Sequence, residues 1–356
     1  MITVISFVVV IGIIILFHEL GHFFAAKISG VRVEEFSIGF PPKMIGKKIG
    51  ETEYQLAWIP LGGYVKMSGM LDESFDDEYD PDDPRGFVAQ SLIKKIFIIT
   101  AGVIMNFLLA FFIYTGVTWY SGVGKIAGTT LTIVSDGSPA AEAGIMMGDS
   151  IVAVNGIRVK DWDELTDLIR SAPGVQVSID WFRNDSLFNA MITPEPTPEL
   201  NVETMQTDTV GKLGILGSFI TEPVGPLTAV KYGASELWMV LDLNVKSIKA
   251  LVTGKASIKQ LAGPIGIAKM SGETARAGFV SFLLFIGLIS ASIGFLNILP
   301  IPMLDGGHLV FIIIEAIIRR PISEKLKINI MKVGLAALLL LITIVSYHDI
   351  LRLFKK

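Results

Sequence analysis

Two histidines near the amino terminus lie four residues apart, with a glutamate beside the first, in the segment His18-Glu-Leu-Gly-His22. In a helix, positions i and i+4 share one face, so both imidazoles would point the same way and could bind one Zn²⁺ ion. Glu19 would lie next to that ion, where its carboxylate could take a proton from water. The spacing therefore predicts a hydrolytic zinc site.

The segment that carries these residues is apolar enough to cross a membrane. Residues 1–17 contain no charged side chain, and the apolar run reaches Ala26, which is long enough for a transmembrane helix. A signal peptide would have a positively charged start and a small-residue cleavage site, and neither is present. Ionisable groups in a span are costly unless they are paired or functional, so a zinc site is preferred over a structural His-Glu-His cluster.

A zinc ion that keeps one position for water needs a third protein ligand. The chain contains no cysteine and four histidines: His18, His22, His308 and His348. Asp305 is the first candidate, because it follows an apolar span and reaches the same predicted depth as His18. It could also cap a helix, which does not exclude ligation. His308 is the rival ligand, or a hydrogen-bonding partner of the site.

Composition indicates a membrane protein. The 356 residues are 51% hydrophobic and 18% charged, with a mean hydropathy of +0.59, whereas roughly a quarter of residues are charged in soluble domains. The net charge of −4 and the lack of a basic stripe argue against nucleic acid as a partner. About four transmembrane helices are expected, at residues 1–26, 96–120, 279–299 and 332–350.

Pro300 and Pro302 break the backbone after the third span. Broken backbone at membrane depth is tolerated only where it is buried in protein or lines a wet cavity, and a hydrolase needs such a cavity. Residues 309–318 are apolar but too short to span, so we expect a buried helix there. Asn297 could bind a substrate backbone or an oxyanion, and a helix–helix hydrogen bond is an equally good interpretation.

The polar segments between the spans predict further elements. Residues 53–67 alternate in polarity around Gly62-Gly63, which predicts a β-hairpin, with residues 55–65 as a candidate edge for β-augmentation. The acidic residues 72–83 predict a solvated loop rather than a metal site, since they lack ligand spacing. Residues 226–252 are apolar at every third or fourth position, which predicts an amphipathic helix on the membrane surface or against the bundle.

A soluble α+β domain is expected between the second and third spans. Its strands are predicted at residues 131–134, 151–154 and 175–181, and its helix at 162–171. The expected domains are residues 1–120 (two spans and a cytoplasmic hairpin loop), 121–222 (the inserted domain), 223–278 (amphipathic helix and linker) and 279–356 (two spans).

Lysine and arginine gather in cytoplasmic loops, and here they predict the orientation. The basic residues close to the spans in the first and third loops are Lys27, Arg32, Lys43, Lys47, Lys48, Lys94, Lys95, Arg319, Arg320, Lys325 and Lys327. Both loops are therefore expected inside, with the inserted domain outside and the active site near the cytoplasmic face. Arg352, Lys355 and Lys356 then fall outside, against the rule.

Taken in order, these segments resemble the site-2 protease family of intramembrane zinc metalloproteases, in its bacterial RseP-like branch with a PDZ domain. The resemblance covers nearly the whole chain. It rests on residues 18–22, 59–67, 101–107, 138–144, 148–156, 261–267 and 297–306. Two departures are a single PDZ signature, where some relatives have two, and Val103, where relatives often have proline.

The resemblance implies Zn²⁺ held by His18, His22 and Asp305, with Glu19 as general base and acid. It implies single-span membrane substrates, such as anti-sigma factors and remnant signal peptides, and a PDZ-like domain that filters substrates by size or docks them. The residues expected to bind substrate are Asn297, Pro300, Pro302, Gly62, Gly63 and Tyr64.

The expected fold is thus a polytopic α-helical membrane protein of about four spans, with a membrane-associated β-hairpin and an inserted extracytoplasmic PDZ-like α+β domain. We expect it in the bacterial inner membrane, in contact with lipids. A membrane scaffold with a structural zinc site is the second hypothesis, and Glu19 and Asp305 argue against it. A transporter or metal sensor ranks third, because paired half-helices are missing.

Overall fold

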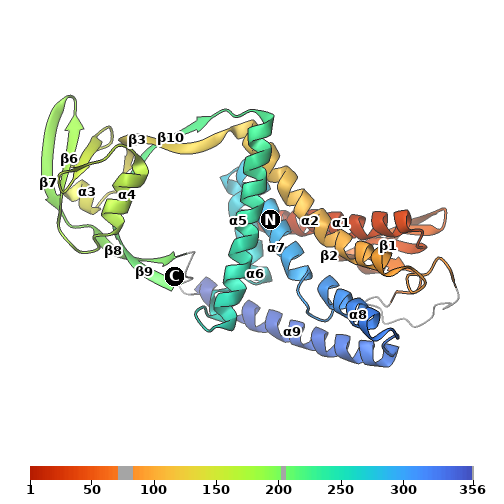
Figure 1. The fold of residues 1–356 in the computed structure, drawn as a ribbon. Coiled ribbons are helices and arrows are strands. Elements are labelled where there is room, and N and C mark those ends of the chain that lie inside the picture. Colours follow the sequence, from red (N-terminus) through yellow and green to blue (C-terminus); the bar gives the residue numbers. More distant parts are fainter. Residues whose placement is uncertain (71–82, 202–205, 355–356) are drawn as a thin grey trace. The chain divides into compact units, whose positions relative to one another are not determined.

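The computed structural model describes residues 1–70, 83–201 and 206–354. The chain forms a helical unit and a β-rich unit (Figure 1). The helical unit comprises residues 1–117, 230–245 and 257–356, and the β-rich unit comprises residues 118–229 and 246–256. Apart from Asp83, the predicted acidic loop lies outside the described residues.

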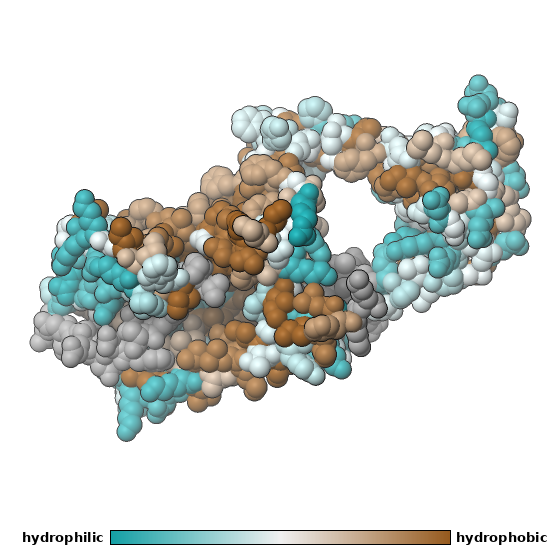
Figure 2. All heavy atoms as spheres, turned by 180° about the vertical axis from the view of Figure 1, so that it is seen from behind, coloured by the Kyte–Doolittle hydropathy of each residue, from teal (hydrophilic) through white to brown (hydrophobic). Residues whose placement is uncertain are grey.

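Four helices of the described chain are long and apolar enough to cross a membrane, as predicted. They are α1 (Ile2–Ser29), α2 (Leu92–Ser121), α7 (Phe279–Asn297) and α9 (Glu324–Phe354). Helices α2 and α9 begin earlier than predicted, because hydropathy marks only the apolar part of a helix and misses its charged first turns. Exposed apolar side chains cover much of the face of this unit seen in Figure 2, as expected for a surface in contact with lipid.

Helix α1 is held by close contacts with α2 and α7. Its Val10 and Ile14 are fully buried in a cluster with Phe285 and Ile286 of α7. A side chain at Gly21 would collide with the carbonyl group of Ala101 in α2. Small residues allow helix backbones to approach closely in membranes, so this glycine brings α2 directly against the face of α1 that carries the histidines.

The predicted helix break lies between α7 and α8 (Asp305–Ile318). Helix α8 confirms that residues 309–318 are helical, and it begins four residues earlier, at Asp305. The expected burial is wrong for much of it: Phe311 and Ile312 are buried, but Ile313, Ile314, Ile317 and Ile318 are exposed, because α8 packs on one face only. The chain turns sharply at Met303, whose φ is 78°. Side chains at Gly306 and Gly307 would collide with the carbonyl groups of the preceding loop, so the glycines after Asp305 let α8 fold back onto that loop.

The loop between α1 and α2 forms an antiparallel pair of strands, β1 (Val33–Ile49) and β2 (Thr52–Met67). The prediction of a hairpin within residues 53–67 is wrong. The turn lies at residues 50–51, and Gly62-Gly63 lie inside β2. Residues 53–56 pair with β1 on both sides, whereas residues 63–65 pair with β1 on one side only. Residues 33–40 also alternate in polarity, and that alternation supplies the partner strand.

The β-rich unit contains a sheet of order β10-β3-β4-β6-β7, with β5 (Ile157–Arg158) beside β4. The predicted strands and helix are confirmed as β3 (Val123–Val134), β4 (Ser150–Val154), β6 (Val177–Arg183) and α4 (Trp162–Arg170). The elements not predicted are α3 (Pro139–Glu142), the short β5, β7 (Ser186–Ile192), β8 (Glu195–Asn201), β9 (Gln206–Lys212) and β10 (Ile215–Glu222). Most of these strands are solvent-exposed and lack a clear apolar alternation.

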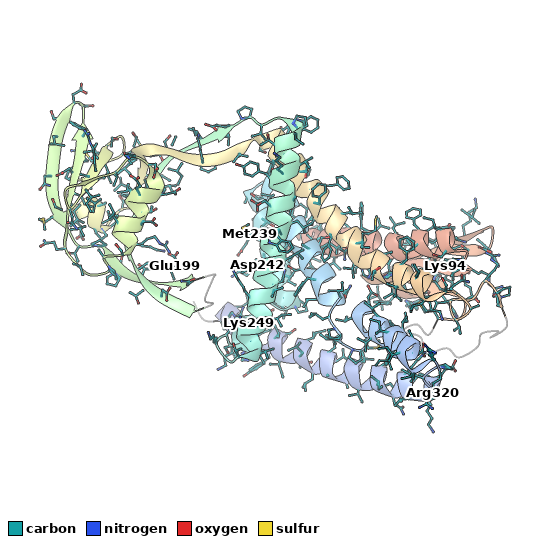
Figure 3. All side chains as sticks on the ribbon, viewed as in Figure 1. Lys94, Glu199, Met239, Asp242, Lys249 and Arg320 are labelled. Carbon is teal, nitrogen blue, oxygen red and sulfur yellow. The ribbon has the colours of Figure 1, made fainter. Side chains whose placement is uncertain are left out.

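Helix α5 (Pro226–Val252) confirms the predicted amphipathic helix. Within the helical unit its Leu237 and Val240 pack with Tyr114 of α2 and Ala291 of α7. Asn244 donates a 3.2 Å hydrogen bond to the hydroxyl of Ser292. Of the two placements predicted, contact with the bundle is therefore the one seen, while Met239 stays exposed (Figure 3).

Helix α6 (Pro264–Ala277) was not predicted, and its first turn is fixed by α9. The buried carboxylate of Asp349 accepts hydrogen bonds from the N–H groups of Gly263 and Gly266, at 2.9 and 2.8 Å. Arg352 donates to the carbonyl group of Leu261 at 2.7 Å. In the predicted orientation Arg352 lies outside, against the rule that basic residues gather in cytoplasmic loops. Its hydrogen bond to the chain before α6 gives it a structural role there.

Candidate active site

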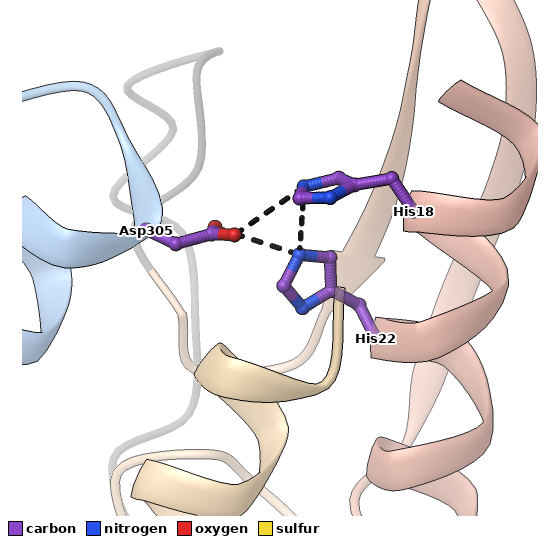
Figure 4. Close-up of side chains that lie close together, drawn as sticks. All are labelled: His18, His22 and Asp305. Carbon is purple, nitrogen blue, oxygen red and sulfur yellow. Dashed lines mark hydrogen bonds and ion pairs between the residues drawn. The ribbon is translucent and has the colours of Figure 1, made fainter. Parts of the chain in front are cut away.

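His18 and His22 of α1 meet Asp305 at the first residue of α8 (Figure 4). The Nε2 atoms of the two imidazoles are 3.2 Å apart. The carboxylate oxygens of Asp305 lie 3.3 Å from His18 Nε2 and 3.4 Å from His22 Nε2. A tetrahedral ion with bonds of roughly 2.0–2.1 Å would separate its ligand atoms by about 3.3 Å. The three side chains thus fit one zinc ion.

The hydrogen bonding of these side chains also fits a cation. His22 Nδ1 lies 2.9 Å from the carbonyl oxygen of Ile98, which can only accept, so Nδ1 carries the hydrogen. In the neutral imidazole, Nε2 then presents a lone pair toward the other two ligand atoms. The Oδ2 atom of Asp305 is buried and has no hydrogen-bond donor in the described part of the chain. Converging acceptors of this kind repel one another unless a cation lies between them.

His308 lines the same cavity, but it is not part of the three-residue cluster. Of the residues described, the group whose ligand atoms lie within 4.8 Å of one another is His18, His22 and Asp305. The geometry therefore favours Asp305 over His308 as the third ligand and leaves His308 as a neighbour.

Glu19 lies beside the second half of β2. A Cβ atom at Gly63 would stand 3.2 Å from Glu19 Cγ and 2.8 Å from the carbonyl oxygen of Ser37. A Cβ at Gly62 would collide with the ring of Phe40. The two glycines thus let the strand pass close to Glu19. This close packing explains why side chains are not accommodated at positions 62 and 63.

A cavity of about 670 Å³ contains these groups. Of the predicted substrate-binding residues, those that line it are Gly62, Gly63, Tyr64 and Asn297. Pro300 and Pro302 do not line it. Pro302 instead lies against Gly334 of α9, so these prolines shape the loop, and the residues that reach the cavity from it are Met303 and Leu304.

Tyr64 is held by the sheet. Its hydroxyl group donates to Glu35 at 2.7 Å and accepts from the side-chain amide of Gln55 at 2.6 Å. Burial and the hydrogen bond to Glu35 raise the pKa of Tyr64 above its usual range, so the hydroxyl stays protonated. Tyr64 therefore stabilises the pairing of β1 and β2 through its hydrogen bonds and does not serve as a proton donor in the cavity.

Sequence reasoning missed Asn106 and Glu35, which also line the cavity. Asn106 lies within the 101–107 stretch that carries part of the family resemblance, which is the one signal that could have indicated it. No pattern in the sequence indicates Glu35.

Apolar helices that carry two imidazoles, a carboxylate and a neighbouring glutamate define a membrane-embedded metallohydrolase. The family model for peptidase family M50 matches residues 6–341. The chain belongs to this family, the site-2 proteases. It is an integral membrane zinc metalloprotease, and Zn²⁺ is its cofactor.

Several relatives match along almost their entire length. The regulator of sigma-W protease RasP of Bacillus subtilis is 30% identical over 426 residues, covering 99% of each chain. The zinc metalloprotease RasP of Bacillus licheniformis matches equally well. A predicted zinc metalloprotease of Clostridium acetobutylicum is 36% identical over 339 residues, covering 95% of this chain and 94% of its own. A solved PDZ domain from Listeria monocytogenes is 26% identical and covers 26% of this chain and 90% of its own, with a TM-score of 0.21.

Proposed function

We propose that this protease cleaves single-span membrane proteins within the membrane, with zinc bound by His18, His22 and Asp305 and with Glu19 as general base. The observation that carries the proposal is the convergence of three ligand atoms beside Glu19, in a cavity lined by transmembrane helices α1, α2 and α7. Ionisable groups at such a depth indicate function.

The chemistry divides between the metal and the chain. Bound zinc supplies Lewis acidity for the scissile carbonyl and lowers the pKa of the attacking water. Glu19 accepts the proton of that water and then delivers it to the nitrogen of the leaving amine. Asn297, whose Nδ2 lies 3.5 Å from His18 Nε2, is placed to donate a hydrogen bond to the substrate carbonyl as negative charge develops on its oxygen.

A transmembrane substrate must be unwound before its peptide bonds can be attacked, because its helix hydrogen bonds enclose them. An extended segment could pair with a free strand edge. Gly63, Tyr64 and Val65 pair with β1 on one side, and no further strand among the described residues pairs with this part of β2. This part of β2 lines the cavity, so it replaces the predicted 55–65 stretch as the proposed substrate edge.

Substrate class and orientation follow from the same proposal. The name of the Bacillus subtilis relative refers to sigma-W regulation, which supports anti-sigma-factor-like substrates, with remnant signal peptides as a second class. Lys94 near the start of α2 and Arg320 after α8 (Figure 3) belong to the loops that the charge rule places inside. The β-rich unit, as a PDZ-like domain, would then lie outside the bacterial inner membrane and admit or dock substrates.

Metal analysis of purified variants tests the ligand set. Asp305→Ala should lose most of its zinc, since two imidazoles alone leave the site incomplete. Glu19→Gln and His308→Ala should keep close to one zinc per chain. Zinc retained in Asp305→Ala but lost in His308→Ala would overturn the assignment.

A further inference from the structure

Asn106 on α2 is a polar side chain that the proposed chemistry leaves without a role. It is fully buried, and its main-chain carbonyl accepts a 2.8 Å hydrogen bond from the hydroxyl of Ser290 on α7. This hydrogen bond holds the backbone of α2 at Asn106 against α7. A buried amide in an apolar bundle is costly unless it is hydrogen-bonded, so its partner indicates its purpose.

That partner is His18. The amide nitrogen of Asn106 lies 3.3 Å from Nδ1 of His18, while Oδ1 of the same amide is buried with no hydrogen-bond donor among the residues described. The nitrogen and oxygen of an amide have nearly the same shape, so their placement follows from the hydrogen bonds they make. Rotation of the amide by a half turn brings Oδ1 to His18 and gives it the Nδ1–H group as a donor.

This rotation sets the tautomer that a metal site needs. A neutral imidazole carries one hydrogen, and only with that hydrogen on Nδ1 does Nε2 offer its lone pair. His18 Nε2 is the atom that faces Asp305. His22 is arranged in the same way, with its Nδ1 at the carbonyl oxygen of Ile98. Helix α2 would thus orient both imidazoles, one through its main chain and one through Asn106.

The packing of α2 supports this arrangement. A Cβ at Gly102 would collide with His22 Nε2 and would lie 2.7 Å from His18 Cε1, so α2 lies directly against both rings. The main-chain carbonyl of Gly102 also interacts with His18 and is the rival acceptor for its hydrogen.

We infer that Asn106 is a positioning residue that holds His18 with Nδ1 protonated and Nε2 directed at the metal, through a hydrogen bond from Nδ1–H to Oδ1. This inference rests on the proposed zinc site. Partners that accept a hydrogen bond from a ligating histidine typically change metal affinity by about 10- to 100-fold when they are removed.

The test measures the zinc affinity of the full-length protein in detergent by competition with a chelator. Asn106→Leu keeps the size of the side chain and removes the acceptor, so its apparent zinc affinity should fall about 10- to 100-fold. Asn106→Asp keeps an oxygen in the same place, so its apparent zinc affinity should stay within about three-fold of the wild-type value. Asn106→Ala serves as a second acceptor-free variant if the leucine impairs folding. Thermal unfolding of the metal-free proteins reports on folding.

Two results would overturn the inference. Wild-type zinc affinity in Asn106→Leu or Asn106→Ala would assign the role to the Gly102 carbonyl. A loss in Asn106→Asp equal to that in Asn106→Leu would show that the amide nitrogen, and not Oδ1, carries the role. His18→Ala separates this inference from the proposed function. If His18→Ala keeps its zinc, the ligand set itself is wrong; if it loses zinc while Asn106→Leu does not, only the role of Asn106 fails.

Discussion

Single residues determine how much space there is beside Glu19, the proposed general base. The sheet lies against α1 at Gly63, where the missing side chain leaves space for Glu19. The same strand residue lines the cavity. The glycine therefore links the proposed substrate edge with the proposed base, although the two residues are far apart in the chain.

Gly63→Ala should lower cleavage by at least about ten-fold while zinc content stays unchanged. The added methyl group would meet the carbonyl oxygen of Ser37 at 2.8 Å and Glu19 Cγ at 3.2 Å, so the strand or the glutamate must move, and small displacements at an active site are costly. Initial rates on a single-span substrate in detergent measure the effect.

The matched control is Gly12→Ala, a change in α1 whose Cβ would meet nothing within 4 Å. It should cleave at the wild-type rate. A Gly63→Ala enzyme that is equally active would show that the contact with Glu19 does not constrain the reaction.

The residues of the proposed metal site were the part whose clustering was most predictable from the sequence. His18, Glu19 and His22 follow from helical spacing, and Asp305 follows from its place after a broken span. The contacts of Gly63 with Glu19 and of Asn106 with His18 were not predictable, because each joins side chains that meet only after the sheet and α2 have packed on α1.

Helices were predictable where a single hydrophobic pattern, either a continuous apolar run or a three- and four-residue spacing, dominates the local sequence. The apolar spans and the three- and four-residue spacing of α5 were identified. The partner of β2 was missed, because the polarity of residues 53–67 alternates on both sides of two glycines and imitates a complete hairpin. Helix α6 was missed because its start depends on Asp349, which lies far along the chain.

In the β-rich unit, one ion pair joins β6 to the turn before β4. The guanidinium of Arg183 donates to both carboxylate oxygens of Asp149, at 2.8 and 2.7 Å, and the N–H of Met146 adds a third bond at 2.8 Å. Burial alone would raise the pKa of Asp149, but these hydrogen bonds outweigh it and lower the pKa below its usual range.

This shift predicts a pH dependence. Because the folded pKa is lower than the unfolded value of about 3.9, the ion pair stabilises the fold above that value and loses its effect as pH falls through the folded pKa. Asp149→Asn should destabilise the unit by about 2 kcal/mol at pH 7, and the gap in Tm from wild type should shrink below about pH 4. Thermal unfolding of both proteins across this range measures the gap, and a gap that stays constant from pH 7 down to pH 3 would contradict the assignment.

At the scale of the whole molecule, the proposed orientation places residues 33–67 and the β-rich unit on opposite sides of the membrane. The chain contains no cysteine, so single cysteines can be labelled selectively. Lys48→Cys in β1 and Lys160→Cys in the β-rich unit replace exposed residues. With an impermeant thiol reagent on bacterial spheroplasts, only Lys160→Cys should be labelled, and Lys48→Cys only after permeabilisation. The reverse pattern would invert the orientation.

The position of the cut within a substrate tests the central claim most directly. Purified enzyme and a single-span substrate are reconstituted together in liposomes, and the masses of both products locate the bond that was hydrolysed. We expect a bond inside the hydrophobic segment to be cut, and no cleavage by Glu19→Gln that retains its zinc. A cut confined to the soluble flanks of the substrate, or the same products from Glu19→Gln, would contradict intramembrane proteolysis by this site.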